Sequence, residues 1–229
     1  MSVAIVTGAS RGLGLALARA LAERGWNLVL DARGRSALAE AARELSVQTK
    51  VVALAGNVAD EAHRRAVVDA ARELGGLDLL VNNASLLGPS PQPRLEDYPL
   101  DVLEDVYRVN VLAPLGLVQL ALPLLHSSGG RVLNVTSDAG VEGYEGWGGY
   151  GSSKAALEQL SNVLAAEHPD LRIYWVDPGD MNTQMHQEAF PGEDISDRPP
   201  PEASVPGLLV LVEGDRPSGR YRTAELVAP

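Results

Sequence analysis

The chain lacks cysteine altogether, which excludes disulfides, thiolate catalysis and cysteine-based metal sites. Histidine is also scarce. The four copies are His63, His126, His168 and His186, and they are scattered without the spacing of metal ligands, so we expect no metal site. Basic residues are outnumbered, at 19 against 30 acidic ones, for a net charge of −11. No Lys/Arg run suggests a nucleic-acid or anionic-membrane partner.

Long apolar runs are missing as well. No uninterrupted run reaches the ~18 residues of a membrane span, and the first expected strand begins by Val3, which leaves no room for a signal peptide. The sequence therefore predicts a cytoplasmic protein without a membrane partner. Its 229 residues and 45% hydrophobic content suffice for one substantial core, which favours a single α/β domain over residues 1–229.

Short apolar runs alternate with helical patterns along most of the chain. Strands are expected at 2–7, 27–31, 50–55, 77–82, 131–135 and 171–176. Helices are expected at 15–24, 38–45, 60–74, 100–125 and 155–166, with Asp60 as an N-cap and Pro114 and Pro123 as possible kinks or ends. Strands that alternate with helices predict parallel βαβ units in a sheet covered on both faces.

The pattern weakens after Gly179. A last helix is expected at 203–213, interrupted by Pro206, and an edge strand at 219–226. Residues 181–201 are polar and contain several prolines, without a clear period. Two interpretations of this segment stay open: a lid over a substrate at the carboxyl end of a strand, or a plain connecting loop.

A glycine-rich turn lies between the first expected strand and the first expected helix, as Thr7-Gly-Ala-Ser-Arg-Gly-Leu-Gly14. Such a turn lets the backbone approach a pyrophosphate, and the N-terminus of the helix supplies free N–H groups with a favourable dipole. The strand–turn–helix context makes a dinucleotide site the favoured interpretation. The alternative is a turn that only packs the helix against the strand.

A second motif places a tyrosine and a lysine four residues apart, at Tyr150 and Lys154, where a helix begins. Residues at this spacing lie one turn apart on the same face. A phenol alone has a pKa of about 10, and a neighbouring ammonium lowers it, so Tyr150 is a candidate acid or base. Ser137 ends the preceding strand, where a loop can bring it beside Tyr150. A chance spacing of a core tyrosine and a surface lysine is the alternative.

Three further elements follow the same order: Asn82-Asn-Ala-Ser85, Asn110 within Val109–Val111, and Pro178-Gly-Asp-Met-Asn-Thr183. With these elements the chain resembles the short-chain dehydrogenase/reductase family over roughly residues 3–183, although Ser85 stands where the family has glycine. The resemblance implies a single Rossmann-type, doubly wound domain with a mostly parallel sheet flanked by helices.

The resemblance also implies roles for four catalytic residues. Tyr150 would be the general acid in carbonyl reduction and the base in alcohol oxidation, and Lys154 would lower its pKa and bind the nicotinamide ribose. Ser137 would hydrogen-bond the substrate oxygen. Asn110 would help to hold a water that relays protons to the lysine. The alternative for Asn110 is a bridge across a helix kink, since Pro114 lies one turn further on.

The same resemblance implies the cofactor contacts. They are Gly8, Ser10, Arg11, Gly12, Leu13, Gly14, Arg33, Asn57, Val58, Asn83, Ala84, Tyr150, Lys154, Pro178, Gly179, Met181 and Thr183. The position that selects NAD would be Ala32, which is not acidic, and Arg33 falls where an arginine binds the 2′-phosphate of NADP. This favours NADP(H). Asp31 leaves NAD(H) open, because a strand shifted by one residue would bring its carboxylate to the ribose.

The sequence thus predicts an NADP(H)-dependent oxidoreductase, of carbonyl reductase type, that acts on a small-molecule carbonyl/alcohol pair. Epimerase, dehydratase or imine reductase chemistry at the same site is one alternative, and a non-enzymatic NADP-binding regulator is another. Candidate pocket residues are Leu86, Leu87, Tyr144, Trp147, Met181 and Met185, each of which is equally well explained by packing. The resemblance implies a homodimer or homotetramer built on the helices at 100–125 and 155–166. The short segment after Thr183 predicts an open pocket, or one completed by another subunit.

Overall fold

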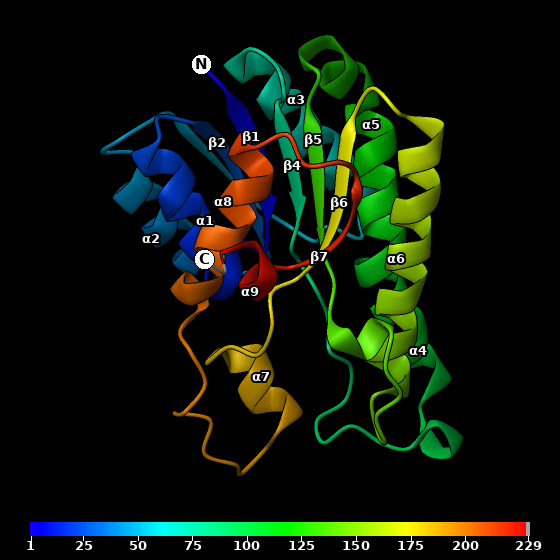
Figure 1. Ribbon diagram of the computed structural model, residues 1–229. Coiled ribbons are helices and arrows are strands. Elements are labelled where there is room, and N and C mark those ends of the chain that lie inside the picture. Colours follow the sequence, from blue (N-terminus) through cyan, green and yellow to red (C-terminus); the bar gives the residue numbers. More distant parts are fainter. Residues whose placement is uncertain (228–229) are drawn as a thin grey trace.

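The computed structural model describes residues 1–227 and contains, within them, one seven-stranded sheet with helices on both faces (Figure 1). The strands are β1 (Val3–Thr7), β2 (Asn27–Ala32), β3 (Val51–Ala55), β4 (Leu79–Asn82), β5 (Arg131–Val135), β6 (Arg172–Asp177) and β7 (Gly219–Arg222). Their order is β3-β2-β1-β4-β5-β6-β7, and every neighbouring pair is parallel. The sheet is therefore wholly parallel, where the sequence predicted a mostly parallel one.

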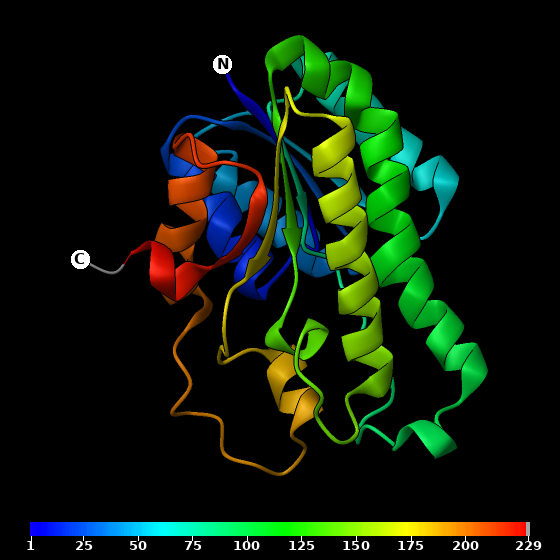
Figure 2. The same ribbon diagram turned by 45° about the vertical axis from the view of Figure 1, so that its right-hand side comes forward.

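The helices follow the strands in alternation. They are α1 (Gly12–Glu23), α2 (Arg35–Leu45), α3 (Glu61–Leu74), α4 (Leu100–Tyr107), α5 (Ala113–Ser128), α6 (Gly148–Glu167), α7 (Gln184–Ala189), α8 (Val205–Glu213) and α9 (Thr223–Leu226). A π-helical turn at Arg108–Leu112 joins α4 to α5. Figure 2 shows α5 and α6 side by side over one face of the sheet. The doubly wound α/β fold that the sequence predicted is confirmed.

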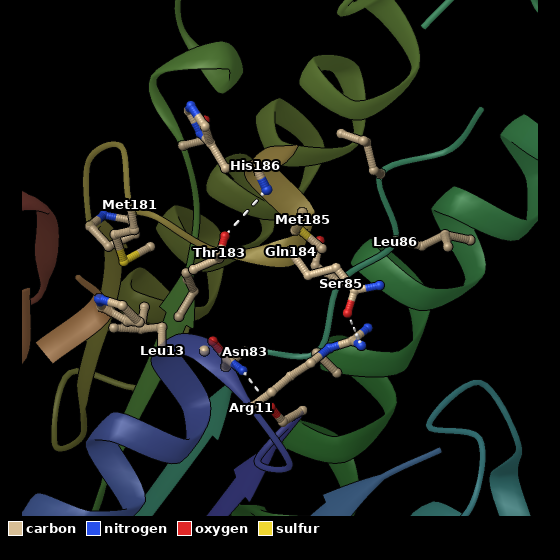
Figure 3. Close-up of a pocket in the computed structure, with 18 of the residues that line it drawn as sticks. Arg11, Leu13, Asn83, Ser85, Leu86, Met181, Thr183, Gln184, Met185 and His186 are labelled. Carbon is tan, nitrogen blue, oxygen red and sulfur yellow. Dashed lines mark hydrogen bonds between the residues drawn. The ribbon is translucent and has the colours of Figure 1, made fainter. Parts of the chain in front are cut away.

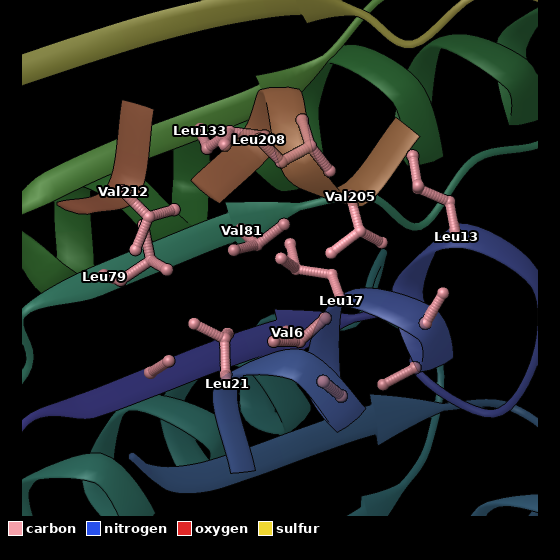
Figure 4. Packing of buried hydrophobic residues seen from close by; sticks show 14 of the residues in the cluster. Val6, Leu13, Leu17, Leu21, Leu79, Val81, Leu133, Val205, Leu208 and Val212 are labelled. Atoms are coloured by element: carbon pink, nitrogen blue, oxygen red, sulfur yellow. The ribbon is translucent and has the colours of Figure 1, made fainter. Parts of the chain in front are cut away.

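Alternating side chains of each strand supply two separate cores. In β1, Ala4 and Val6 pack under α1 and α8, whereas Val3 and Ile5 pack under α3 and α5. Figure 4 shows the first of these cores, where Val205, Leu208 and Val212 of α8 meet Leu13, Leu17 and Leu21 of α1 above the strand residues Val6, Leu79, Val81 and Leu133. The five inner strands are thus largely buried on both faces, as a parallel sheet requires, whereas the edge strands β3 and β7 are only partly buried.

Several boundaries differ from the predicted ones. Helix α6 begins at Gly148, two turns before the expected start at Ala155. The sequence missed this start because the glycines of the first turns show no apolar periodicity. Pro206 does not interrupt α8; it lies in the first turn, where its missing N–H has no partner to lose. The expected edge strand at 219–226 is a strand only to Arg222 and then becomes α9. Asp60 precedes α3 as expected, although its side chain makes no capping bond among the described residues.

The stretch Leu100–Ser128 is long and apolar enough, by length and composition alone, to cross a membrane. In this fold it is the core-facing layer that covers β4 and β5. Leu117, Val118 and Leu125 are each almost fully buried, against a cluster that includes Val67 and Val68 of α3. Packing between the sheet and α3 accounts for its apolar composition.

The strand order reverses between β1 and β4, which opens a crevice at the carboxyl ends of the strands. The β1–α1 turn, the end of β4 and the end of β5 all reach this edge. The segment that carries α7 lies beyond the same edge in Figure 1, below the ends of the strands. The fold therefore brings the glycine-rich turn, the tyrosine helix and the segment at 181–201 to one place.

Candidate active site

A cavity of about 910 Å³ runs along the carboxyl edge of the sheet (Figure 3). Its lining includes most of the predicted site residues: Gly8, Ser10, Arg11, Gly12, Leu13, Arg33, Asn57, Val58, Asn83, Ala84, Ser137, Tyr150, Lys154, Pro178, Gly179, Met181 and Thr183. Of the predicted site residues, Gly14 and Asn110 are not part of the cavity lining. Residues from seven separate stretches of chain thus meet at one cleft, although what each binds stays a prediction.

The glycine-rich turn is held in shape by β4. The Thr7 hydroxyl donates to the Val81 carbonyl at 3.1 Å and accepts from the backbone N–H of Asn83 at 3.0 Å. The Asn83 amide in turn donates to the carbonyls of Thr7 at 2.9 Å and Gly8 at 3.2 Å. These bonds fix the end of β1 to the end of β4 across the crevice.

Three glycines in this turn are required by geometry. Gly8 and Gly12 have φ of +65° and +55°, a region that side chains strain to adopt. A Cβ on Gly14 would lie 2.5 Å from the Gly8 carbonyl oxygen, so α1 packs against the turn only because Gly14 has none. Helix α1 begins at Gly12 beside the cavity, and no side chain of the described residues caps it. Its first N–H groups are therefore available to an anion, which fits a dinucleotide pyrophosphate.

The residues that would choose between NADP and NAD lie at the end of β2. Arg33 is exposed and lines the cavity, while Ala32 is buried in the strand. Arg11 donates to the Gln184 side chain of α7, and Figure 3 shows the two facing each other across the cleft. Asp31 is also in the lining, but it is buried and bonded to His63, whose Nε2 lies 2.5 Å from its Oδ1. Burial raises the pKa of Asp31, and the contact with His63 opposes that rise.

Tyr150 and Lys154 lie together at the centre of the cleft. Lys154 is 2% exposed, its Nζ donates to the Val135 carbonyl at 2.8 Å, and it lies 5.3 Å from the centroid of the Tyr150 ring. Burial lowers the pKa of Lys154 to about 8, with Glu158 opposing the change. Burial also raises the pKa of Tyr150 well above its ordinary value, and Asp177 and Asp138 add to the rise. The predicted lowering of the tyrosine pKa is therefore not found, because burial of the phenol is the largest influence on it.

The serine next to Tyr150 is not the one that the sequence singled out. Ser85 has one hydroxyl hydrogen: donated to Tyr150 it lowers the pKa of the phenol, in opposition to burial, and donated to Asn110 it makes a bond of 3.1 Å. Ser137 lines the same cavity, but its hydroxyl donates to Asp138 at 2.9 Å. Ser137 must therefore turn from Asp138 to reach a substrate oxygen. The sequence did offer one indication that Ser85 matters, because this serine stands where the family has glycine.

Asn110 lies in the π-helical turn and is 1% exposed. Its side-chain oxygen accepts from the Leu86 backbone N–H at 2.7 Å, and its amide donates to the Leu86 carbonyl at 2.9 Å and to Ser153 at 2.9 Å. The side chain thus joins the irregular turn to the chain after β4 and to α6. This arrangement supports the bridging alternative, and the water relay stays a prediction.

The sequence did not predict a charged network that lies behind Lys154 and Ser137. Glu158, one turn after Lys154 on α6, accepts from Thr136 at 2.7 Å and from the guanidinium of Arg220 at 3.0 Å. Arg220 of β7 also donates to the Ser137 carbonyl at 3.3 Å and lies 3.6 Å from Asp177. The strand pairing brings position 220 beside β6, and no local pattern reveals that partner.

The far end of the cleft is apolar. Leu87, Tyr150 and Ala139 form a small buried cluster, and the cluster packs against Trp147 and Met185. The Trp147 ring lies edge-on to Tyr150, at 5.8 Å between centroids. Of the candidate pocket residues, Leu86, Leu87, Trp147, Met181 and Met185 line the cavity. Tyr144 does not; its hydroxyl is turned to Asp138 and Glu142.

No group of three or more His, Asp or Glu residues within 1–227 is placed to hold a metal ion. The chain matches the family described as short chain dehydrogenase over residues 2–194. It belongs to the short-chain dehydrogenase/reductase family. The Rossmann-type fold, the oxidoreductase class and NAD(P) binding that the sequence predicted are therefore confirmed for this chain, while the assignment of individual cofactor-binding residues stays a prediction.

Individual relatives agree with this membership. Benzil reductase ((S)-benzoin forming) of Saccharomyces cerevisiae is 33% identical over 99% of this chain and 85% of its own length. The structure of a putative short chain dehydrogenase from Pseudomonas syringae superimposes with a TM-score of 0.91 at 33% identity, covering 97% of this chain and 94% of that one. A putative short chain dehydrogenase from Escherichia coli, complexed with NADPH, has a TM-score of 0.84 at 30% identity, covering 97% and 96%.

Proposed function

We propose that this short-chain dehydrogenase/reductase uses NADP(H) to reduce a carbonyl, or oxidise the corresponding alcohol, with Tyr150 as the general acid or base. The observation that carries the proposal is the convergence of Tyr150, Lys154 and Ser137 at the centre of a cleft that also contains the glycine-rich turn. When bound, the nicotinamide supplies or accepts the hydride. The residues of the chain bind, orient and handle the proton.

In reduction, the substrate oxygen lies between the hydroxyls of Tyr150 and Ser137. Tyr150 holds its proton through the neutral range because burial raises its pKa, so it is present as the donor form of the acid. Ser137 supplies a second hydrogen bond, which strengthens as negative charge develops on the oxygen. Lys154 is a buried cation below a pH of about 8. Its positive charge disfavours a second positive charge in the same pocket.

NADP(H) is proposed over NAD(H) because Arg11 and Arg33 line the cleft at the end where a 2′-phosphate would lie, whereas Ala32 offers no carboxylate. The NADPH complex of the Escherichia coli relative supports the same choice. We expect the double substitution R11Q/R33Q to raise the NADPH dissociation constant at least tenfold more than the NADH one. R35Q, an exposed arginine outside the cleft lining, is the control. Equal effects on both cofactors would contradict the assignment.

The substrate is proposed to be an uncharged carbonyl with an apolar or aromatic group. Trp147, Leu87 and Met185 form the wall beside Tyr150, and the similarity to benzil reductase points the same way. W147A should raise KM for aryl ketones several-fold more than KM for acetone-sized ketones. The matched control is Y144F, because Tyr144 neighbours Trp147 but lies outside the cavity lining.

The deciding experiment follows NADPH oxidation over a panel of ketones, aldehydes, quinones and imines, for wild type and Y150F. Turnover of related carbonyls that is lost in Y150F supports the proposal. Turnover restricted to imines, or product formation without net NADPH loss, favours the imine-reducing or redox-neutral alternatives. Tight NADPH binding with no chemistry in either protein favours a regulator.

We also propose a homodimer or homotetramer, as the family resemblance implies. Leu112 is 56% exposed at the start of α5 and Val163 is 41% exposed on α6, and these two helices lie together on the same face of the molecule (Figure 2). L112E/V163E should convert the assembly to monomer in light scattering. V47E, at an exposed valine remote from both helices, should leave it intact.

A further inference from the structure

The end of β2 holds a buried acid–base pair that the proposed chemistry does not use. Asp31 is 1% exposed, and its carboxylate lies 2.5 Å from Nε2 of His63, in the first turn of α3. The His63 side chain is itself 13% exposed. Asp31 lines the cleft beside Gly8 and Arg33, so the pair lies directly under the end of the site where a cofactor ribose would rest.

The surroundings are built to keep this ring in place. A Cβ on Gly56 would lie 2.3 Å from Nδ1 of His63, so the imidazole occupies the space that any side chain at position 56 would take. Asp31 is fixed as well, because its backbone carbonyl accepts from the N–H of Ala9, in the glycine-rich turn, at 2.9 Å. The pair therefore links β2, α3 and the glycine-rich turn.

A free carboxylate at this end of β2 has a known chemical preference. It accepts hydrogen bonds from the 2′-hydroxyl of NAD and repels the 2′-phosphate of NADP. In this chain an N–H of His63 can donate to Asp31 in the neutral or the charged form of the ring, and the charged form also cancels the carboxylate charge. In either form the hydrogen bond from His63 occupies the Asp31 carboxylate, so this carboxylate no longer opposes the binding of a 2′-phosphate beside Arg33.

We propose that His63 is a positioning residue for cofactor choice: by holding Asp31, it masks a carboxylate that would otherwise reject the 2′-phosphate, and so preserves the preference for NADPH. The inference rests on the proposed NADP(H) dependence and adds to it a residue that touches no cofactor. It also settles the ambiguity that Asp31 left in the sequence. The strand register does not shift; Thr7 pairs with Asp31, and the carboxylate is engaged elsewhere.

The test is a double-mutant cycle of wild type, H63A, D31N and D31N/H63A, with dissociation constants for NADPH and NADH measured by titration calorimetry at pH 7.5. H63A should lower the ratio of NADPH to NADH affinity about tenfold, the effect of one partly screened charge. D31N alone should change the ratio less than threefold, and H63A should have no further effect in the D31N background. Circular dichroism melting checks that each variant is folded.

Two results would overturn the masking. One is an equal change of the ratio by H63A in both backgrounds, or no change in either. The other needs no H63A protein: a tenfold gain in NADPH preference from D31N alone would mean that Asp31 was never masked. A wild-type protein that prefers NADH would instead refute the proposed cofactor, so the two failures are distinguishable.

Discussion

Lys154 should make the protein less stable at neutral pH, and its removal should stabilise the fold while abolishing activity. The ammonium is 2% exposed and burial lowers its pKa from 10.5 to about 8. Each pKa unit corresponds to about 1.4 kcal/mol, so holding this charge costs the folded state about 3 kcal/mol at pH 7. K154M also loses the bond to the Val135 carbonyl, worth about 1 kcal/mol. The net expected gain in the free energy of unfolding is about 2 kcal/mol.

The pH dependence gives this prediction its sign. The folded-state pKa lies below the unfolded value, so between pH 8 and 10.5 the unfolded chain binds the proton that the folded chain has released. The buried charge therefore lowers the free energy of unfolding of wild type below pH 8, and this loss becomes smaller as the pH rises toward 10.5. The advantage of K154M, about 2 kcal/mol at pH 7, should disappear near pH 10.

Urea unfolding followed by tryptophan fluorescence, at pH 7 and pH 10, measures both values. The matched control is K50M, because Lys50 is exposed in the same chain and its substitution should leave stability within about 0.5 kcal/mol at both pH values. A K154M protein that is no more stable than wild type at pH 7, or whose advantage persists at pH 10, would refute the reasoning. NADPH turnover in K154M should fall at least a hundredfold.

Four other perturbations give independent checks. Y150F should lower kcat by about 10²–10⁴ while the NADPH dissociation constant stays within threefold. S85A removes the hydrogen bond that lowers the pKa of Tyr150, so the alkaline limb of the pH–rate profile should move to higher pH; an unmoved limb would contradict that role. R220M leaves Glu158 buried without its cation and should destabilise the fold by about 3 kcal/mol in urea, with R220M/E158L recovering most of the loss. G8A should cost about 1–3 kcal/mol and weaken NADPH binding, because φ is +65° and the new Cβ would lie 2.8 Å from the Asn83 amide.

The sequence predicted most of the fold because the strands carry a simple signal. A strand that is buried on both faces reads as a nearly continuous apolar run, as at Val3–Thr7, and its alternation with helices implies parallel pairing. Glycine-rich stretches carry no such signal. The start of α6 at Gly148 was missed for that reason, although the tyrosine–lysine spacing that depends on the helix was recognised.

The residues proposed to be catalytic could be singled out from the sequence because the chemistry proposed for them depends on local spacing. Tyr150 and Lys154 share one helix, and the glycine-rich turn is one continuous stretch. Their energetics were not predictable in the same way. Whether Lys154 lowers the pKa of Tyr150 depends on how deeply both are buried, and burial is set by β5, α6 and the segment at 181–201 together.

Residues that act through distant partners lay beyond the sequence for the same reason. Asp31 and His63 are 32 residues apart, and Glu158 and Arg220 are 62 apart, and each pair meets only through the order of the strands and the packing of a helix on them. Asp31 lines the cleft and Glu158 lies one turn behind Lys154, and each buried carboxylate is engaged by its partner from the side away from the cleft. A cleft that must receive an anionic dinucleotide gains from this arrangement, because every unmasked carboxylate in its wall would oppose binding. On the proposed function, the side chains that hold these carboxylates from behind the cleft should therefore favour cofactor binding together with the arginines that face it.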